Sequence, residues 1–161
     1  MFDKFGEFDS AEELNKTAEG LRAEGDVQSL MMLAEENGLD PEDLTDFIDG
    51  LATFSTFQTA ALGKLKVEKE DLKPSEIVRD WIDYIESEAL EDGKLARAIR
   101  EKGKSLIGCI GAILKWSYTN KYKVDDRIIK ASGIKITGVE MGIPGMATAR
   151  EIIRRYYGCE S

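Results

Sequence analysis

Apolar residues recur every three or four positions along most of this 161-residue chain, and this spacing predicts amphipathic helices. The most hydrophobic helix is expected from Ser105 to Tyr118, with the serine as its N-cap. Its apolar face would hold Leu106, Cys109, Ile110, Ile113, Leu114 and Ser117. The pattern therefore predicts an all-α fold, a compact bundle of about six to eight helices around this central apolar helix.

Side chains that cap helix N-termini mark several of the expected helix starts. They are Ser10, Asp26, Asp40 and Asp125. Asp40 is followed by a proline and by acidic residues, which the helix dipole favours in a first turn. Apolar positions then continue to Leu65, so we expect one long helix or two helices that break near Gly50 or Gly63.

A glycine-rich segment precedes the last predicted helix, with Gly138, Gly142 and Gly145 in the spacing G-x3-G-x2-G. This spacing differs from the dinucleotide and phosphate-loop motifs, which favours a turn at the helix entry over an anion site, although the anion site stays open as the alternative. We expect Gly145→Val to damage folding. At most one short strand pair is expected near residues 134–141, because a lone strand there has no evident partner.

Charge divides the chain into two unlike parts. Residues 1–92 hold 8 Lys/Arg and 25 Asp/Glu, whereas residues 93–161 hold 14 and 6. We therefore expect an acidic helical region over residues 1–73 and a helical core over residues 74–161 with a basic C-terminal half. The two parts either face each other and partly neutralise, or serve separate partners.

The residue types present exclude several kinds of chemistry. The chain has no histidine, which rules out Ser-His, Cys-His and histidine-metal sites, and its two cysteines are too few for a four-ligand zinc site. Carboxylates alone leave a Mg²⁺ or Ca²⁺ site formally open, but their spacing does not fit a calcium loop. We expect no catalytic residue, no metal, no cofactor and no membrane segment, and hence a non-enzymatic cytoplasmic protein.

Carboxylates concentrate at the start of the third predicted helix, as Asp40, Glu42, Asp43, Asp46 and Asp49. A solvated helix surface explains them most simply. The sharper interpretation is mimicry, because spaced carboxylates resemble a phosphate backbone and can occupy a basic nucleic-acid groove of a partner protein.

Basic and aromatic residues alternate in the C-terminal half. The candidates for contact with nucleic acid or an acidic partner are Lys121, Lys123, Arg127, Arg150, Arg154 and Tyr157. In the last helix we expect Arg150, Arg154 and Tyr157 to share one surface. A helix surface whose charges pair with one another is the competing interpretation, since Glu151 lies four residues before Arg155.

Short motifs between Leu95 and Tyr157 resemble the PcfK-like family of small proteins from conjugative elements and phages. The matching residues are Lys104, Ser105, Leu106 and Cys109, then Asp125 and Asp126, then Tyr156 and Tyr157. The usual His-Tyr-Tyr ending of that family is Arg155-Tyr156-Tyr157 here, and the first ninety residues lie outside the match.

One branch of this family inhibits the type II RNA-guided nuclease of CRISPR systems. The resemblance implies a mobile-element protein that binds such a nuclease inside the bacterial host and blocks its nucleic-acid binding or cleavage. The alternative is a DNA-binding accessory protein of conjugation or phage replication that uses the basic half. A third possibility is a homo-oligomer in which acidic and basic halves pair between copies.

Overall fold

The computed structural model describes residues 1–160 and confirms the all-α prediction. The N-terminal part contains α1 (Ala11–Glu24), α2 (Val27–Glu36), the 3-10 turn η1 (Pro41–Asp43) and α3 (Leu44–Ile48). The middle contains α4 (Phe57–Leu72), α5 (Glu76–Glu91), α6 (Gly93–Arg100) and α7 (Leu106–Thr119). The C-terminal part contains β1 (Tyr122–Lys123), α8 (Asp126–Ser132), β2 (Glu140–Met141) and α9 (Met146–Tyr156).

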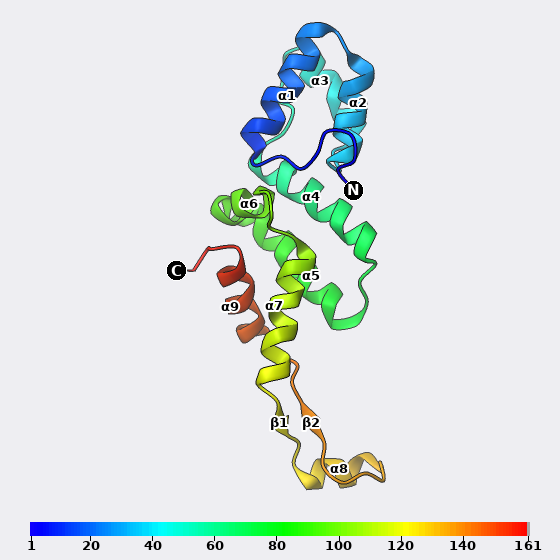
Figure 1. Ribbon diagram of the computed structural model, residues 1–161, viewed down its shortest axis with the longest axis vertical. Helices are drawn as coiled ribbons and strands as arrows, with labels where there is room; N and C mark the ends of the chain where they lie inside the picture. The colour runs from blue at the N-terminus through cyan, green and yellow to red at the C-terminus, as the bar shows by residue number, and fades with distance from the viewer. Residues whose placement is uncertain (161) are drawn as a thin grey trace.

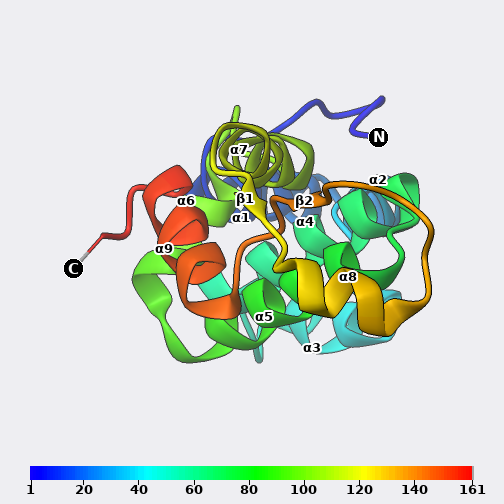
Figure 2. The ribbon, with the colours of Figure 1, turned by 90° about the horizontal axis from the view of Figure 1, so that it is seen from below.

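The helices are stacked along one long axis (Figure 1). At one end lie α1, α2 and α3, and α4 crosses the molecule beneath them. The middle is formed by α5, α6, α7 and α9, and α7 runs roughly along the long axis. At the other end, β1, α8 and β2 project away from the bundle as an arm, which Figure 2 shows from below. We use "arm" for residues 121–143.

Two hydrophobic clusters meet in α4. The first joins α1, α2 and α3 through Leu14, Leu30 and Phe47, and Ala60 of α4 completes it. The second joins α5, α6, α7 and α9, and Ala61 and Leu65 of α4 belong to it, together with Ile82, Ile85, Leu95, Ile99, Leu106, Ile113 and Ile153. Neighbouring residues of one helix thus face both clusters. The division of the chain at residues 73 and 74 stays a prediction.

The prediction for α7 is only half right. Leu106, Cys109 and Ile113 are fully buried, as expected. Leu114 was expected on the same face but is 68% exposed, because α7 covers one side of the second cluster instead of lying at its centre.

Glycines allow two close approaches that position the elements. An added Cβ on Gly63 of α4 would lie 2.2 Å from the carbonyl oxygen of Asn37, so α2 and α4 pack backbone against backbone. An added Cβ on Gly142 would lie 2.2 Å from the carbonyl oxygen of Ser117, which brings the end of the arm back onto α7. The predicted break falls at Gly50, where φ is +74°, and α4 runs through Gly63 without interruption.

A strand pair forms within the arm. Tyr122 is paired with Met141 and Lys123 with Glu140, in antiparallel register. The strand therefore lies at the end of the segment expected for it, and its partner comes from the chain that follows α7.

The expectation for Gly145 is wrong. Gly145 has a φ of −64°, which any residue adopts, and an added Cβ there would meet nothing within 4 Å. Gly142 is the glycine of this segment that packing requires.

Candidate functional site

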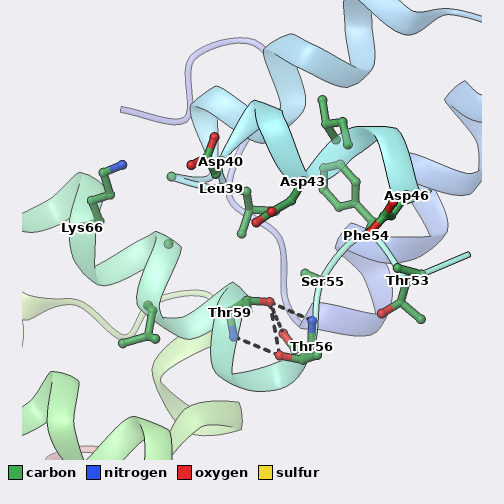
Figure 3. A pocket seen from close by; sticks show the side chains of 15 residues that line it. Leu39, Asp40, Asp43, Asp46, Thr53, Phe54, Ser55, Thr56, Thr59 and Lys66 are labelled. Atoms are coloured by element: carbon green, nitrogen blue, oxygen red, sulfur yellow. Dashed lines mark hydrogen bonds between the residues drawn. The ribbon is translucent and has the colours of Figure 1, made fainter. Parts of the chain in front are cut away.

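The five predicted carboxylates lie on the surface of the N-terminal end, and three of them line one groove. Asp40, Asp43 and Asp46 stand on one wall of a groove of about 490 Å³ (Figure 3). The opposite wall is α4, which contributes Thr59 and Lys66. Glu42 and Asp49 are exposed outside the groove. We call this site the acidic groove and residues 1–56 the acidic end.

Local hydrogen bonds fix the walls of the acidic groove. The carboxylate of Asp40 accepts a hydrogen bond from the backbone N–H of Glu42 at 2.9 Å and so caps η1. At the opposite wall, the Thr56 side chain accepts from the backbone N–H of Thr59 at 3.1 Å, and the Thr59 side chain accepts from that of Thr56 at 2.8 Å. This reciprocal capping box starts α4 (Figure 3).

The charges of the acidic groove are directed outward. Within residues 1–160, none of the five carboxylates forms an ion pair with a side chain of the protein. Residues 1–56 hold 15 Asp/Glu and 3 Lys/Arg, a net charge of −12. The acidic end is therefore a concentrated source of negative potential.

The arm places the predicted basic residues at the far end of the molecule. Lys121, Lys123 and Arg127 are all exposed there. Arg127 forms a bidentate contact with Asp125 at 3.0 and 2.8 Å, and this contact lowers the pKa of Asp125 below its usual value. The Lys121 ammonium lies 4.5 Å from the centre of the Tyr118 ring. The arm, residues 121–143, holds 5 Lys/Arg and 3 Asp/Glu, so a weakly basic end lies opposite the acidic end along the long axis (Figure 1).

The predicted basic surface of the last helix is not a free surface. Arg154 donates to Glu88 at 2.6 Å and to Asp92 at 3.0 Å, and both contacts raise the pKa of the arginine. The guanidinium of Arg150 lies 4.9 Å from the centre of the Tyr84 ring. Both arginines thus join α9 to the acidic α5, so the two charged parts of the chain do neutralise each other here.

The prediction that Tyr157 shares this surface is wrong. Tyr157 is 3% exposed, and burial raises the pKa of its hydroxyl. It follows the last residue of α9, where the chain turns back through Gly158 at a φ of +71° and carries the ring into the core. Cys159, two residues later, is buried as well.

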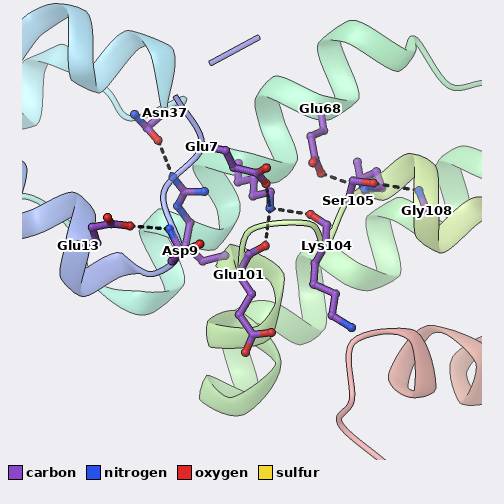
Figure 4. Close-up of polar contacts among 12 residues, drawn as sticks. Glu7, Asp9, Glu13, Asn37, Glu68, Glu101, Lys104, Ser105 and Gly108 are labelled. Atoms are coloured by element: carbon purple, nitrogen blue, oxygen red, sulfur yellow. Dashed lines mark hydrogen bonds and ion pairs between the residues drawn. The ribbon is translucent and has the colours of Figure 1, made fainter. Parts of the chain in front are cut away.

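A buried polar cluster under the N-terminal segment was missed by the sequence analysis (Figure 4). Lys64 of α4 is 1% exposed and donates to Glu7 at 2.7 Å and to the carbonyl oxygens of Glu101 and Lys104 at 3.0 and 2.6 Å. One turn later, Glu68 accepts from the backbone N–H of Leu106 at 3.0 Å. Burial raises the pKa of Glu68, despite that hydrogen bond.

Arg100 completes the cluster from α6. It donates to the side chain of Asn37 at 2.8 Å, and its Nε and Nη1 have no partner among the described residues. The ring centres of Phe2 and Phe8 lie 5.7 and 5.8 Å from its guanidinium, so aromatic faces replace the missing acceptors. A signal for part of this cluster was present in the sequence, because Lys64 and Glu68 fall on the helix face of Ala61 and Leu65.

Most of the residues that carry the family resemblance lie near the contact of α7 with α9, whereas Asp125 and Asp126 start α8 in the arm. The hydroxyl of Tyr156 accepts from the backbone N–H of Ser105 at 2.9 Å, and Lys104 donates to the carbonyl oxygen of Tyr156 at 2.7 Å. A Cβ on Gly108 would lie 2.2 Å from that same hydroxyl. Burial raises the pKa of the Cys109 thiol to about 12, which makes it an inert packing group. These contacts join α7 to α9.

No group of three or more Cys, Asp or Glu residues in the described chain is arranged to hold a metal ion. Residues 1–160 include no helix that is both long and apolar enough to cross a membrane. Comparison with family models, with curated proteins and with solved structures gives no match to this chain.

Proposed function

We propose that this protein is a non-enzymatic inhibitor that binds, through its acidic end, the basic nucleic-acid channel of another protein. The class of partner that we favour is an RNA-guided CRISPR nuclease, which the resemblance in the C-terminal half suggests. The inhibitor would come from a phage or conjugative element, act in the bacterial cytoplasm, and block nucleic-acid binding or cleavage.

The acidic groove is the observation that carries this proposal. Its three carboxylates, with Glu42 and Asp49 beside it, form no ion pair within residues 1–160, so binding would break no internal ion pair. A channel lined by Lys and Arg has a positive potential that attracts concentrated negative charge, and salt weakens this attraction. Capped and packed elements keep these carboxylates in place, which lowers the entropy cost of binding.

Replacement of the five carboxylates by their amides tests the proposal. Binding to a purified type II nuclease is measured by surface plasmon resonance, with and without guide RNA, over a salt series. We expect the variant to raise the dissociation constant at least tenfold, about 1.4 kcal/mol, and the wild-type affinity to fall steeply with salt.

A matched control removes the same charge elsewhere. The five exposed acids for this control are Glu70, Asp71, Asp80, Glu91 and Glu151. Their amide variant should bind as the wild type does. Equal losses in both variants would mean that net charge, and not the acidic groove, determines binding. Tight binding that survives the loss of the groove carboxylates would refute the proposal.

A second candidate function rests on the arm. Its lysines are exposed, the Lys121 ammonium lies over the exposed ring of Tyr118, and Tyr122 is exposed as well. Exposed basic and aromatic side chains suit contact with a phosphate backbone and with unstacked bases. We therefore also propose a DNA-binding accessory role in conjugation or phage replication. An electrophoretic mobility assay at low salt tests it, and the role fails if the protein alone shifts neither single-stranded nor double-stranded DNA.

A further inference from the structure

The outward face of α7 is apolar and uncovered. Ile107, Leu114 and Tyr118 are 59%, 68% and 73% exposed, and they lie on the side opposite the buried residues of this helix. Lys115 is the one charged residue in the 14 residues of α7. A soluble protein rarely leaves such a face in water unless another molecule covers it.

Gly111 lies in the middle of this face and has no role within one copy. Gly108 makes room for the Tyr156 hydroxyl, and Gly142 makes room for the backbone of α7. An added Cβ on Gly111 would meet nothing within 4 Å. Because glycine weakens an exposed helix relative to alanine, its presence here is unexplained by the contacts of the monomer.

The spacing of these four residues is that of a short coiled-coil seam. Positions 107, 111, 114 and 118 are separated by four, three and four residues, which is the alternation of the two core positions of a heptad. We call Ile107, Gly111, Leu114 and Tyr118 the α7 stripe. In an antiparallel pair the order of one stripe is reversed, so that Leu114 faces Gly111 and Tyr118 faces Ile107. Leu114 then fills the space beside Gly111, whereas parallel helices would place glycine opposite glycine.

Charge favours the same orientation. The acidic end has a net charge of −12 and the arm a net charge of +2, and they lie at opposite ends of a molecule along whose long axis α7 runs (Figure 1). Two copies in antiparallel orientation place unlike ends on the same side, and parallel copies place like ends together. The helix dipoles of the two α7 helices also oppose each other only in the antiparallel pair.

We propose that the α7 stripe is the interface of a homodimer, in which it packs antiparallel against the same stripe of a second copy. Each Leu114 enters the space beside Gly111 of the other copy. The interface is isologous, so each copy offers the same surface and the assembly closes as a dimer. This inference is independent of the proposed inhibitor function, since it uses neither the acidic groove nor a foreign partner.

The size of the stripe sets the expected affinity. A helix of 14 residues is about 21 Å long, and one face of it buries less than the roughly 800 Å² per partner of a standard interface. We therefore expect a dissociation constant of about 1 to 100 μM. Analytical ultracentrifugation from about 1 to 500 μM, at two salt concentrations, covers this range.

Gly111→Ala should stabilise the monomer and weaken the dimer, so the two effects can be measured separately. The new methyl group stabilises the exposed helix. The melting temperature, measured at a protein concentration too low for the dimer to form, should therefore rise by roughly 1 to 4 °C. The same methyl group fills the space that Leu114 of the second copy needs, so the dissociation constant should rise at least tenfold. Gly20→Ala is the control, because Gly20 is also an exposed helical glycine with nothing within 4 Å of an added Cβ. It should raise the melting temperature and leave the dimer unchanged.

Cross-linking tests the orientation. Ile107→Cys and Tyr118→Cys should form a disulfide with each other when the two variants are mixed, and the native cysteines do not interfere because both are buried. An Ile107→Cys variant that links only to itself would overturn the antiparallel arrangement. Sedimentation as a monomer up to 500 μM would overturn the dimer, and loss of nuclease or DNA binding by Leu114→Glu in that case would assign the stripe to a different partner.

Discussion

Lys64→Met probes the contact that joins the N-terminal segment to the rest of the chain. The ammonium of Lys64 is fully buried and has three acceptors, the Glu7 carboxylate and two carbonyl oxygens of the α6–α7 connection. Methionine has a similar length and no charge, so the substitution removes these bonds without opening a large cavity.

The expected loss of unfolding free energy follows from the acceptors that lose the Lys64 ammonium. Loss of one partner of a buried ion pair costs about 3–5 kcal/mol, and each buried acceptor without a donor costs about 1–3 kcal/mol. Glu7 retains 26% of its side-chain exposure, so water can solvate its carboxylate and reduces the loss. We expect the free energy of unfolding to fall by about 3 kcal/mol, and the melting temperature to fall by about 6–12 °C.

Urea unfolding followed by circular dichroism measures this change. The control is Lys66→Met, two residues along α4, where the side chain is exposed and the expected change is below about 0.5 kcal/mol. If Lys64→Met unfolds at the same urea concentration as Lys66→Met, the buried cluster does not stabilise the fold as described.

Two further experiments test other parts of the structure. The raised pKa of Glu68 means that the folded state binds its proton more tightly, a contribution that is complete below the unfolded pKa and is lost as pH rises through the folded pKa. The stability of the wild type relative to Glu68→Gln should therefore increase as pH falls from 7 toward 4, and a difference that is constant with pH would contradict the assignment. Gly142→Ala should cost about 1–3 kcal/mol because its Cβ meets the Ser117 carbonyl, whereas Gly145→Ala should change thermal stability by less than about 0.5 kcal/mol, and equal melting temperatures would exclude the close approach.

Features that depend on neighbouring residues were predictable from the sequence. Ser10, Asp26, Asp40 and Asp125 all cap helices as expected, because a cap needs only the next two or three N–H groups. The interruption of the helix at Gly50 is likewise a local feature, because it depends on the conformation of one glycine.

Features that depend on the packing of distant elements were not predictable. Helical spacing predicts which residues of α7 are neighbours on the helix surface. Only the tertiary structure shows that Leu114 faces water and that Tyr157 faces the core. The sequence places Lys64 on an apolar helix face but does not show its acceptors, which lie nearly 60 residues before it and about 40 residues after it. The sequence also does not show that Arg154 is paired, because its acidic partners Glu88 and Asp92 lie more than 60 residues before it.

The candidate site combines both kinds of feature. The acidic character of residues 40–49 is visible in the composition, and the structure adds that Asp40, Asp43 and Asp46 face one groove. The separation of the acidic end from the basic arm is likewise a property of the fold (Figure 1). Charge counts along the sequence indicate two unlike halves, but they do not show that the acidic end and the arm lie at opposite ends of the molecule.

The central claim is that the acidic groove competes with nucleic acid, and a displacement experiment tests it most directly. Fluorescently labelled guide RNA or target DNA is bound to the type II nuclease, and its anisotropy is followed as this protein is added. We predict that the wild type and the control with amides at Glu70, Asp71, Asp80, Glu91 and Glu151 displace the nucleic acid equally. The variant with amides at Asp40, Glu42, Asp43, Asp46 and Asp49 should need at least ten times more protein. Equal displacement by all three proteins, or by none of them, would contradict the account.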